Sequence, residues 1–400
     1  MKNNPKNLFL HADGDSFFVA CELTLRPDLK GLPVIVGEDR GIAVAMSAEA
    51  KKLGVTRGMP IFKIKKLFPQ VVILPHHFDL YNDISGRMQQ ILLSYSVTIE
   101  AYSIDECFAI IEPSDVTYFG GEKKLLTELK NEIEKTLGVT YSLGLARTKA
   151  LAKQASKLEK PNGMVLLLSK EDEIRALKST PIDDVWGIGG RTAPLLYNLG
   201  LHTAYDFVNY SRDEIIKNFS EPLSVLQKEL SGESIFEVSD DVDPRDQKSI
   251  QSTSTFRPPS SDIKIIWREI AENVEHACSR AREINLVSNK VSFFVKTNNF
   301  KYFFDEAKLT LFTADPGTVL KAIEPLLPKL LVTNETIRST GIILHNLTRE
   351  ENTPRDLFGN QEKSLSGLII EKTADKIRER YGDGAIKRAS SLKKKQKNRT

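Results

Sequence analysis

The chain of 400 residues begins with short apolar runs, which alternate with segments whose apolar residues recur at helical spacing. Runs of the first kind predict strands, and the helical spacing predicts amphipathic helices. The expected strands are 8–12, 33–37, 42–46, 98–102, 107–111 and 141–145, and the expected helices are 16–25, 47–53, 81–95 and 125–137. Apart from the stretch between residues 37 and 78, this order of elements is typical of a ferredoxin-like unit. The pattern therefore predicts such a unit with an inserted subdomain.

The later part of the chain predicts helices and then a second α+β unit. Residues 170–230 have helical spacing, and residues 231–250 are acidic and predict a linker. The second unit has expected helices at 263–284 and 319–331 and expected strands at 290–296, 308–312 and 339–344. Beyond residue 349 the chain is polar, except for an amphipathic piece at 365–381. We expect an α+β multidomain fold, because a chain of this length is too long for one compact core.

The charge of the chain is nearly balanced in sum but unevenly distributed. With 56 basic and 53 acidic residues, the formal net charge is +3, which taken alone argues against a nucleic-acid-binding protein. Residues 387–400, however, hold seven basic residues and no acidic one, and residues 51–66 are basic as well. Each cluster alone is typical of a solvated helix face, whereas several together favour a surface that binds phosphates.

Other features exclude whole classes of protein. No apolar run approaches the roughly 18 residues that span a bilayer, and the first residues are too polar for a signal peptide. We therefore expect a cytoplasmic protein without a membrane partner. Cys21, Cys107 and Cys278 lie far apart and lack metal-site spacing, so that neither a disulfide framework nor a structural zinc site is expected.

The strongest chemical signal is a set of three carboxylates. Asp13 follows the first expected strand, and Asp105 and Glu106 lie at the tip of a predicted hairpin. The first and third strands of a ferredoxin-like sheet are neighbours, so these side chains are expected to lie together. Clustered carboxylates repel one another unless a cation neutralises them, and a pair of Mg²⁺ ions held in this way supports phosphoryl transfer. The alternative is that Asp13 caps a helix and the acidic pair only forms a turn.

Four stretches of the sequence occur together in a highly specific order and spacing. They are Leu10-His-Ala-Asp-Gly-Asp-Ser-Phe-Phe18, Ala48-Glu-Ala-Lys-Lys-Leu-Gly-Val55 with Gly58-Met-Pro60, Tyr102-Ser-Ile-Asp-Glu106 and Lys160-Pro-Asn-Gly163. Through them the chain resembles the Y-family translesion DNA polymerases of the DinB/UmuC group, from about residue 8 to residue 345. The resemblance implies a template-directed, Mg²⁺-dependent polymerase that adds dNTPs to the primer 3′-hydroxyl of a primer-template DNA.

The resemblance also implies roles for individual residues. Asp13, Asp105, Glu106 and the Gly14 carbonyl are expected to hold the metal ions. The nucleotide contacts implied in the same way involve Phe17, Phe18, Lys51 and Lys160, with Phe18 as the steric gate against the 2′-hydroxyl. From the residues alone, Phe18 is typical of core packing and Lys160 of a solvated surface. Lys51 stands where many family members carry Arg, which removes a bidentate phosphate contact and leaves the nucleotide affinity in doubt.

DNA and clamp contacts are implied in the second half of the chain. The glycine-rich stretch at 185–190 resembles a helix-hairpin-helix element, in which Gly187, Gly189 and Gly190 let backbone amides approach phosphates. The entrance of the second α+β unit supplies further polar candidates, namely Ser252, Thr253, Thr255 and Arg257. Leu357 and Phe358 resemble the apolar anchors of a peptide that binds the sliding clamp, although the usual leading Gln is absent.

The resemblance divides the chain into a palm at 1–166 with a fingers insert at about 20–77, a helical thumb at 167–230, an acidic linker at 231–249, a little finger at 250–348 and a polar, basic tail at 349–400. Two alternatives stay open. One is a catalytically silent relative that only binds DNA and clamps, and the other is a nucleotidyl cyclase on a similar palm. Several UmuC-like features also permit a requirement for accessory subunits.

Overall fold

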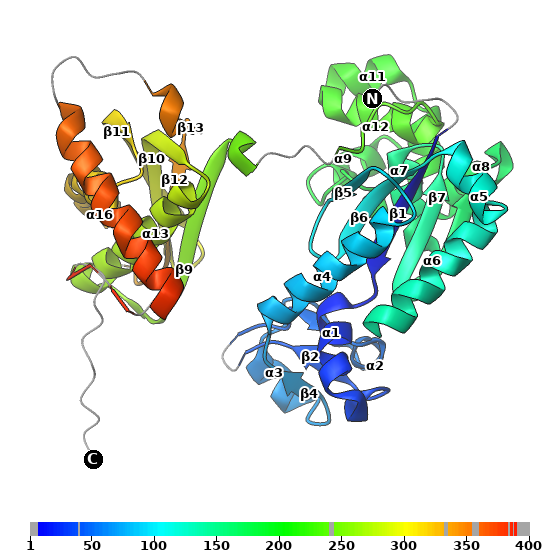
Figure 1. Cartoon of the computed structure of the whole chain (residues 1–400), viewed down its shortest axis with the longest axis horizontal. Coiled ribbons are helices and arrows are strands. Elements are labelled where there is room, and N and C mark those ends of the chain that lie inside the picture. The colour runs from blue at the N-terminus through cyan, green and yellow to red at the C-terminus, as the bar shows by residue number, and fades with distance from the viewer. Residues whose placement is uncertain are drawn as a thin grey trace. The chain divides into compact units, whose positions relative to one another are not determined.

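The computed structural model describes residues 7–38, 41–239, 244–331, 335–353, 360–382, 385–386 and 388–389. The chain forms two compact units, Met1–Asp241 and Val242–Thr400 (Figure 1). The boundary between the units falls within the acidic segment 231–249. The finer division into palm, fingers, thumb and tail at the expected residues stays a prediction.

A five-stranded sheet, here called the palm sheet, forms the centre of the first unit. Its strand order is β5-β6-β1-β7-β8, and β1 pairs antiparallel with both β6 and β7. This is the strand order of a ferredoxin-like sheet, as the sequence predicts, with β8 as an added strand that the sequence pattern did not predict. The strands are β1 (Leu8–Gly14), β5 (Ile99–Ala101), β6 (Glu106–Ile111), β7 (Tyr141–Ala146) and β8 (Met164–Leu167).

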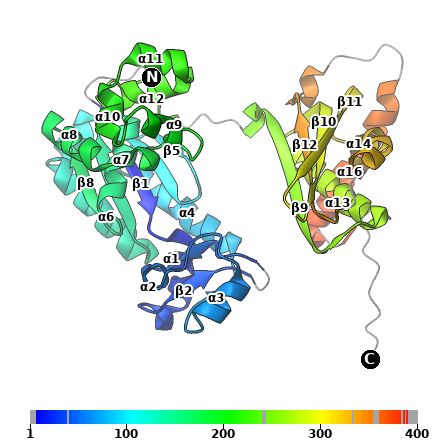
Figure 2. The ribbon, with the colours of Figure 1, turned by 180° about the vertical axis from the view of Figure 1, so that it is seen from behind.

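Helices cover the palm sheet on both faces, which Figures 1 and 2 show from opposite sides. Leu10 and Ala12 of β1 pack into one apolar core with helices α4 (Phe78–Leu93) and α6 (Glu122–Leu137). Phe9 packs into a second core on the other face with α7 (Lys149–Leu158). Because both faces are covered, Phe9 to Gly14 of β1 are all buried and this part of the strand has no solvent-exposed face.

The inserted subdomain follows α1 (Phe17–Leu25) and has a small sheet of its own. Its strand order is β3-β2-β4, with β2 (Val34–Val36), β3 (Ala45–Met46) and β4 (Val72–Leu74). Helices α2 (Ala48–Lys52) and α3 (Ile61–Leu67) accompany this sheet. The Ser47 hydroxyl caps α2 by accepting a hydrogen bond from the Ala50 amide. The segment thus has a core separate from that of the palm sheet.

Short helices build the end of the first unit. After α5 (Pro113–Phe119) and the palm helices, residues 170–231 form α8 (Lys170–Ser179), α9 (Ala193–Asn198), α10 (Ala204–Asn209), α11 (Arg212–Asn218) and α12 (Glu221–Ser231). Their apolar side chains share the core beneath α7, so that this helical part packs directly on the palm sheet.

The second unit is an α+β layer with a different strand order. Its sheet has the order β11-β10-β12-β9, so the first strand in sequence lies at an edge. The strands are β9 (Ser249–Ser260), β10 (Leu286–Thr297), β11 (Tyr302–Thr313), β12 (Ile337–His345) and the short β13 (Thr348–Arg349), which pairs with β10. Among the helices of this unit are α13 (Ile263–Glu283), α14 (Pro316–Ile323), α15 (Leu327–Leu330) and α16 (Asn360–Tyr381).

Two features of the second unit differ from what the pattern indicates. The twelve-residue strand β9 is not among the expected strands, because its polar residues conceal the alternation of buried and exposed positions. The unit shares the element order of the palm but not its strand order, since pairing between distant strands is not encoded in local spacing.

None of the helices in the described part of the chain combines the length and apolarity needed to cross a bilayer. Cys21, Cys107 and Cys278 are buried and free, and burial raises the pKa of each thiol to about 12.

Close packing between β7 and α7 yields a test of the palm. A Cβ atom on Gly144 would lie 2.2 Å from the Ala152 carbonyl oxygen and 2.4 Å from the Ser156 nitrogen. We therefore expect Gly144→Ala to lower the free energy of unfolding by about 1–3 kcal/mol or more, because backbone atoms cannot move aside. Gly86→Ala, in open space on α4, is the control and is expected to stabilise the chain by up to about 1 kcal/mol. Urea unfolding followed by circular dichroism measures both changes, and equal stability of the two variants would contradict this packing.

Candidate active site

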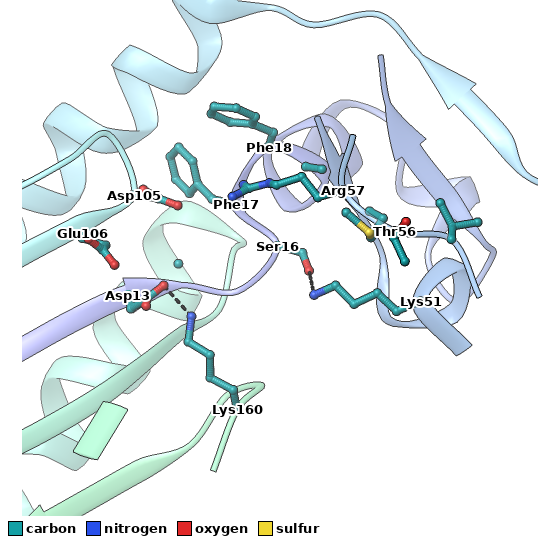
Figure 3. Close-up of a pocket in the computed structure, with 14 residues that line it drawn as sticks. Asp13, Ser16, Phe17, Phe18, Lys51, Thr56, Arg57, Asp105, Glu106 and Lys160 are labelled. Atoms are coloured by element: carbon teal, nitrogen blue, oxygen red, sulfur yellow. Dashed lines mark hydrogen bonds and ion pairs between the residues drawn. The ribbon is translucent and has the colours of Figure 1, made fainter. Parts of the chain in front are cut away.

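A cavity of about 570 Å³ lies between the end of the palm sheet and the inserted subdomain. Figure 3 shows the three carboxylates on one side, Lys51 and Thr56 on the other, and the two phenylalanines between them. The lining residues are Asp13, Gly14, Ser16, Phe17, Phe18, Ala45, Met46, Lys51, Val55, Thr56, Arg57, Asp105, Glu106 and Lys160. All eight residues expected to contact metal or nucleotide are among them.

Antiparallel pairing brings the three acidic residues to one end of the palm sheet. Asp13 of β1 is the register partner of Glu106 of β6, although 92 residues separate them in sequence. The Gly14 amide donates a hydrogen bond of 2.9 Å to the Asp105 carbonyl, which ties the hairpin tip to the end of β1. Residues far apart in sequence therefore lie side by side.

Each carboxylate of this set has a partner within the chain. The Lys153 ammonium donates to both oxygens of Glu106 at 2.8 Å, and Lys160 forms an ion pair with Asp13. The Ser103 hydroxyl donates to Asp105 at 2.6 Å. Burial raises the pKa of Asp13, although the nearby Lys160 ammonium acts in the opposite direction. Charge repulsion among the acids is thus offset by two lysines.

Lys153 was not singled out by the sequence, which shows it only as one of several lysines near residue 150. In the structure it is 5% exposed and lies over three aromatic rings. Its ammonium is 4.6 Å from the ring centroid of Tyr102, 5.9 Å from Phe108 and 5.6 Å from Trp186. The Trp186 indole also donates a hydrogen bond of 3.1 Å to the Tyr102 hydroxyl. Lys149 and Lys153 are four residues apart and therefore lie on one face of α7. This spacing was the sequence signal that could have shown that both lysines face the palm sheet.

The segment that carries Lys160 is held by a buried acid next to the site. Asp15, which is 8% exposed, accepts hydrogen bonds from the Asn162 amide at 2.7 Å and the Ser142 hydroxyl at 2.8 Å. This anchors the 160–163 stretch against the ends of β1 and β7. Asp15 is therefore a positioning residue that the sequence interpretation missed.

The opposite wall of the cavity is basic and comes from the inserted subdomain. The Lys51 ammonium donates to the Ser16 hydroxyl at 3.2 Å. Arg57, which the sequence interpretation counted only within a basic stretch, donates from Nε to the Val44 carbonyl at 2.9 Å and lines the same cavity. A guanidinium is therefore present on this wall even though Lys51 replaces the usual Arg.

The two phenylalanines at the start of α1 have different surroundings. Phe17 is buried at 3% exposure, whereas Phe18 is half-buried and stacks on Tyr81 with ring centroids 4.5 Å apart and planes 16° apart. The Tyr81 hydroxyl donates at 2.5 Å to Glu22, a buried carboxylate. Burial, followed by this hydrogen bond, raises the pKa of Tyr81. The hydrogen bond and the complete burial of Tyr81 hold its ring in position. Phe18 thus rests on a fixed support.

The donor chemistry of the acidic wall suits a hard divalent cation. Carboxylate and backbone carbonyl oxygens are the ligands that Mg²⁺ prefers, and the buried Asp13 carboxylate lacks the solvation that would stabilise its charge. Within the described ranges, no three His, Cys, Asp or Glu side chains are gathered closely enough to hold a metal. Lys153 and Lys160 hold Glu106 and Asp13 instead. The oxygen donors fit such an ion by their chemical type, and lysines are the counter-charges in this structure.

The expected DNA contacts are distributed over both units. Gly187, Gly189 and Gly190 are exposed, and Gly187 has a positive φ of 85°. Thr253, Thr255 and Arg257 lie at exposed positions of β9. Ser252, the fourth expected DNA contact on β9, is only partly exposed and lies on the other face of the strand.

Ser252 lies on the helix-covered side of β9, where its hydroxyl donates to Asn273 at 3.2 Å. The pleat of a strand turns alternate side chains to opposite faces, which separates Ser252 from Thr253 and Thr255. The clamp-binding candidates Leu357 and Phe358 lie outside the described residues.

Comparison with known protein families is consistent with this geometry. Residues 12–157 match the impB/mucB/samB family, and residues 247–357 match the C-terminal domain of that family. Residues 170–201 match the helix-hairpin-helix motif of the IMS family. The chain belongs to the impB/mucB/samB family of Y-family DNA polymerases.

Individual relatives are similar over nearly their whole length. DNA polymerase IV of Ureaplasma parvum serovar 3 is 30% identical over 364 residues, which cover 90% of this chain and 99% of the relative. Protein UmuC of Salmonella typhimurium is 30% identical over 397 residues, covering 95% and 92%. The solved structure of a Y-family DNA polymerase chimera has a TM-score of 0.72 at 24% identity, over 86% of this chain and 99% of that chain.

These findings confirm several predictions about the polymerase. It is a DNA-directed DNA polymerase of the translesion type, with palm, fingers, thumb and little finger, and the match at 170–201 confirms the helix-hairpin-helix element. A catalytically silent relative is not favoured, and a polymerase also takes the place of the cyclase alternative. The roles of individual site residues remain predictions.

The pairing of Lys153 with Glu106 yields a second test. We expect Lys153→Met to lower the free energy of unfolding by about 1–3 kcal/mol, because a partly buried carboxylate loses its partner. Glu106→Gln and the double variant complete a thermodynamic cycle measured by urea unfolding. A coupling energy of about 1 kcal/mol or more between the two positions is expected, and strict additivity would show that the ion pair contributes nothing.

Proposed function

We propose that this chain extends a primer 3′-hydroxyl on a DNA template by attack on the α-phosphate of a dNTP, with release of pyrophosphate, assisted by two Mg²⁺ ions. The observation that carries the proposal is the pairing of Asp13 with Glu106 next to Asp105, opposite a basic wall in the same cavity. Carboxylates suit the metal ions, and the basic wall suits a triphosphate. The cavity thus has the two kinds of group that this reaction requires.

Residues of the palm would hold the metal ions. Asp13, Asp105, Glu106 and the Gly14 carbonyl are the proposed ligands. When bound, the two ions lower the pKa of the attacking hydroxyl and neutralise charge on the triphosphate and the leaving group. Lys153 keeps the Glu106 carboxylate oriented through its contacts of 2.8 Å to both oxygens.

Basic residues from two elements would hold the triphosphate. Lys160 pairs with Asp13 in this structure, and its ammonium would contact the phosphates if Asp13 held a metal ion. Lys51 and Arg57 approach from the opposite wall. Arg57 restores a planar guanidinium to a pocket in which Lys51 offers only a point charge. The nucleotide is then gripped from both sides, which orients the α-phosphate for in-line attack.

Phe18 is the proposed steric gate beneath the sugar. Its ring is held between Tyr81, stacked at a centroid distance of 4.5 Å, and Phe78, edge-on at 6.1 Å. A ring supported on two sides cannot yield to an additional hydroxyl. The Phe18 ring would therefore exclude a 2′-hydroxyl both because it is large and because its neighbours hold it in place.

Primer-template DNA would be held outside the cavity by sequence-independent contacts. The exposed glycines Gly187, Gly189 and Gly190 suit close approach of backbone amides to phosphates. Thr253, Thr255 and Arg257 on the exposed side of β9 suit the second unit for the same task. A sliding clamp bound through Leu357 and Phe358, and accessory subunits, remain parts of this proposal without support in the described residues.

The metal ligands are tested by primer extension. We expect Asp105→Ala and Glu106→Ala each to reduce extension by about a hundredfold or more, because each change removes charge stabilisation from the transition state. Glu128→Gln on the surface of α6 is the matched control and should extend like wild type. Extension should also stop on chelation and resume with added Mg²⁺. Wild-type extension by either alanine variant would overturn the assignment.

Sugar selection by Phe18 is tested separately. We expect Phe18→Ala to raise rNTP incorporation relative to dNTP by about tenfold or more, since removal of the ring makes room for the 2′-hydroxyl. Tyr81→Phe keeps the stacked support, loses only the hydrogen bond to Glu22 and should retain most of the discrimination. Single-turnover incorporation with matched nucleotides gives both ratios. Unchanged selectivity in Phe18→Ala would assign the ring to core packing.

A further inference from the structure

Three aromatic rings surround the ammonium of Lys153 and are here called the aromatic cage. They belong to Tyr102, Phe108 and Trp186, and their centroids lie 4.6, 5.9 and 5.6 Å from the lysine Nζ. The Tyr102 ring is nearly perpendicular to both of the others, with interplanar angles of 83° to Phe108 and 88° to Trp186. The Trp186 indole N–H also donates to the Tyr102 hydroxyl at 3.1 Å. The cage is therefore a connected group of side chains.

The cage explains how a flexible side chain can hold a carboxylate in one orientation. A lysine ammonium sits on a flexible four-carbon stem, so that a single ion pair fixes it poorly. Ring faces attract an ammonium, and the Trp ring does so most strongly. The Lys153 ammonium is thus held between the rings and Glu106, whose two oxygens it contacts at 2.8 Å. Because Glu106 lines the cavity and Lys153 does not, the lysine holds the carboxylate from behind the cavity wall.

One ring of the cage comes from outside the palm sheet. Phe108 belongs to β6, and Tyr102 lies in the hairpin between β5 and β6, so both rings are fixed to the strands that carry Glu106. Trp186 instead lies within residues 170–201, which match the helix-hairpin-helix motif. The position of the lysine, and through it that of the carboxylate, therefore depends on a residue of the helical part.

A second lysine–aromatic pair in the same helical part provides a matched comparison. The Lys178 ammonium lies 4.9 Å from the centroid of Tyr205, and the Tyr205 ring packs on the same apolar core as Trp186. These two residues belong to α8 and α10, and neither of them lines the cavity. Tyr205 thus has the same core and the same kind of contact as Trp186, but its lysine does not reach the site.

We propose that Trp186 is a positioning residue for the polymerase reaction, because it fixes the Lys153 ammonium and the lysine orients the Glu106 carboxylate towards a metal ion. This role goes beyond the proposed function but rests on it, since it takes Glu106 as a metal ligand. Groups that orient a ligand carboxylate belong to the metal site, and their loss typically lowers metal affinity by about ten- to a hundredfold. The orientation of one ligand then depends on a segment expected to bind duplex DNA.

The test measures metal binding in a complex that cannot react. The full chain is bound to a primer-template whose primer ends in a dideoxynucleotide, the matching dNTP is added, and Mn²⁺ stands in for Mg²⁺. Electron paramagnetic resonance measures the free Mn²⁺, against a reference that contains the DNA and the dNTP without protein. The variants are Trp186→Leu, the ring-keeping Trp186→Phe, Tyr205→Leu as the matched control, and Lys153→Met with and without Trp186→Leu.

We expect Trp186→Leu to weaken Mn²⁺ binding about tenfold, whereas Trp186→Phe keeps most of the affinity and Tyr205→Leu keeps all of it. In the Lys153→Met background, Trp186→Leu should cause no further loss, because the ring acts through the lysine. Three results would each overturn the proposal: wild-type binding by Trp186→Leu, an equal loss in Tyr205→Leu, or a further loss in the Lys153→Met background.

Two more variants complete the experiment. Should circular dichroism show that Trp186→Leu does not fold, Tyr102→Leu removes another ring of the cage from a residue that is 44% exposed. It is expected to weaken Mn²⁺ binding as well, and wild-type binding would again contradict the proposal. Asp105→Ala separates this proposal from the proposed function. Unchanged Mn²⁺ binding in Asp105→Ala would contradict the metal site itself, whereas a loss there beside wild-type binding in Trp186→Leu would contradict only the role of Trp186.

Discussion

Repulsion among carboxylates is the constraint around which the first unit is organised. Asp13 and Glu106 are cross-strand partners at the end of two buried strands, with Asp105 beside them. Such an arrangement is unfavourable unless positive charge is supplied. Lys153 from α7 and Lys160 from the following loop supply it, and both lie on segments that pack against the same end of the palm sheet. The charges of the site thus determine what must surround it.

Further residues hold the two lysines that pair with the carboxylates. Asp15 holds the loop that carries Lys160, through the Asn162 amide. On the other side, Tyr102, Phe108 and Trp186 surround the Lys153 ammonium, and Trp186 comes from the helical end of the unit. A carboxylate proposed to bind metal is therefore linked through one lysine to the segment expected to grip DNA.

The two sheets show how strand order decides what a sheet can do. The palm sheet has its first strand in the middle and helices on both faces, so that its chemistry is confined to the strand ends. In the second unit the first strand lies at an edge, and one face remains free for Thr253, Lys296 and the exposed rings of Tyr302 and Phe304. Both units have the same order of elements along the chain. Their sheets differ in which strands pair.

Much of the local structure was readable from the sequence. Apolar runs and helical spacing predicted most of the palm strands and helices within a few residues, because burial imposes a period on each element. They did not predict α5, α7 or β8. The twelve-residue strand β9 escaped prediction because polar residues occupy even its half-covered positions. Motif resemblance identified the family and the cavity residues, whereas Arg57, Asp15 and Lys153 were missed. Lys153 had one local signal, its spacing from Lys149 on one helix face, whereas nothing local marks Arg57 or Asp15 as a residue that enters a site.

The pattern of apolar and polar positions along the chain was enough to predict the class of fold. The motifs were enough to predict the family and the three carboxylates of the site. Tertiary structure alone decided that Glu106 meets Lys153, that Arg57 shares a cavity with Lys51, and that Tyr302 and Phe304 share a bare face. The physical reason is the range of the interactions. Periodicity and capping act over a few residues, whereas ion pairs, ring stacking and strand register join residues that only the folded chain brings together.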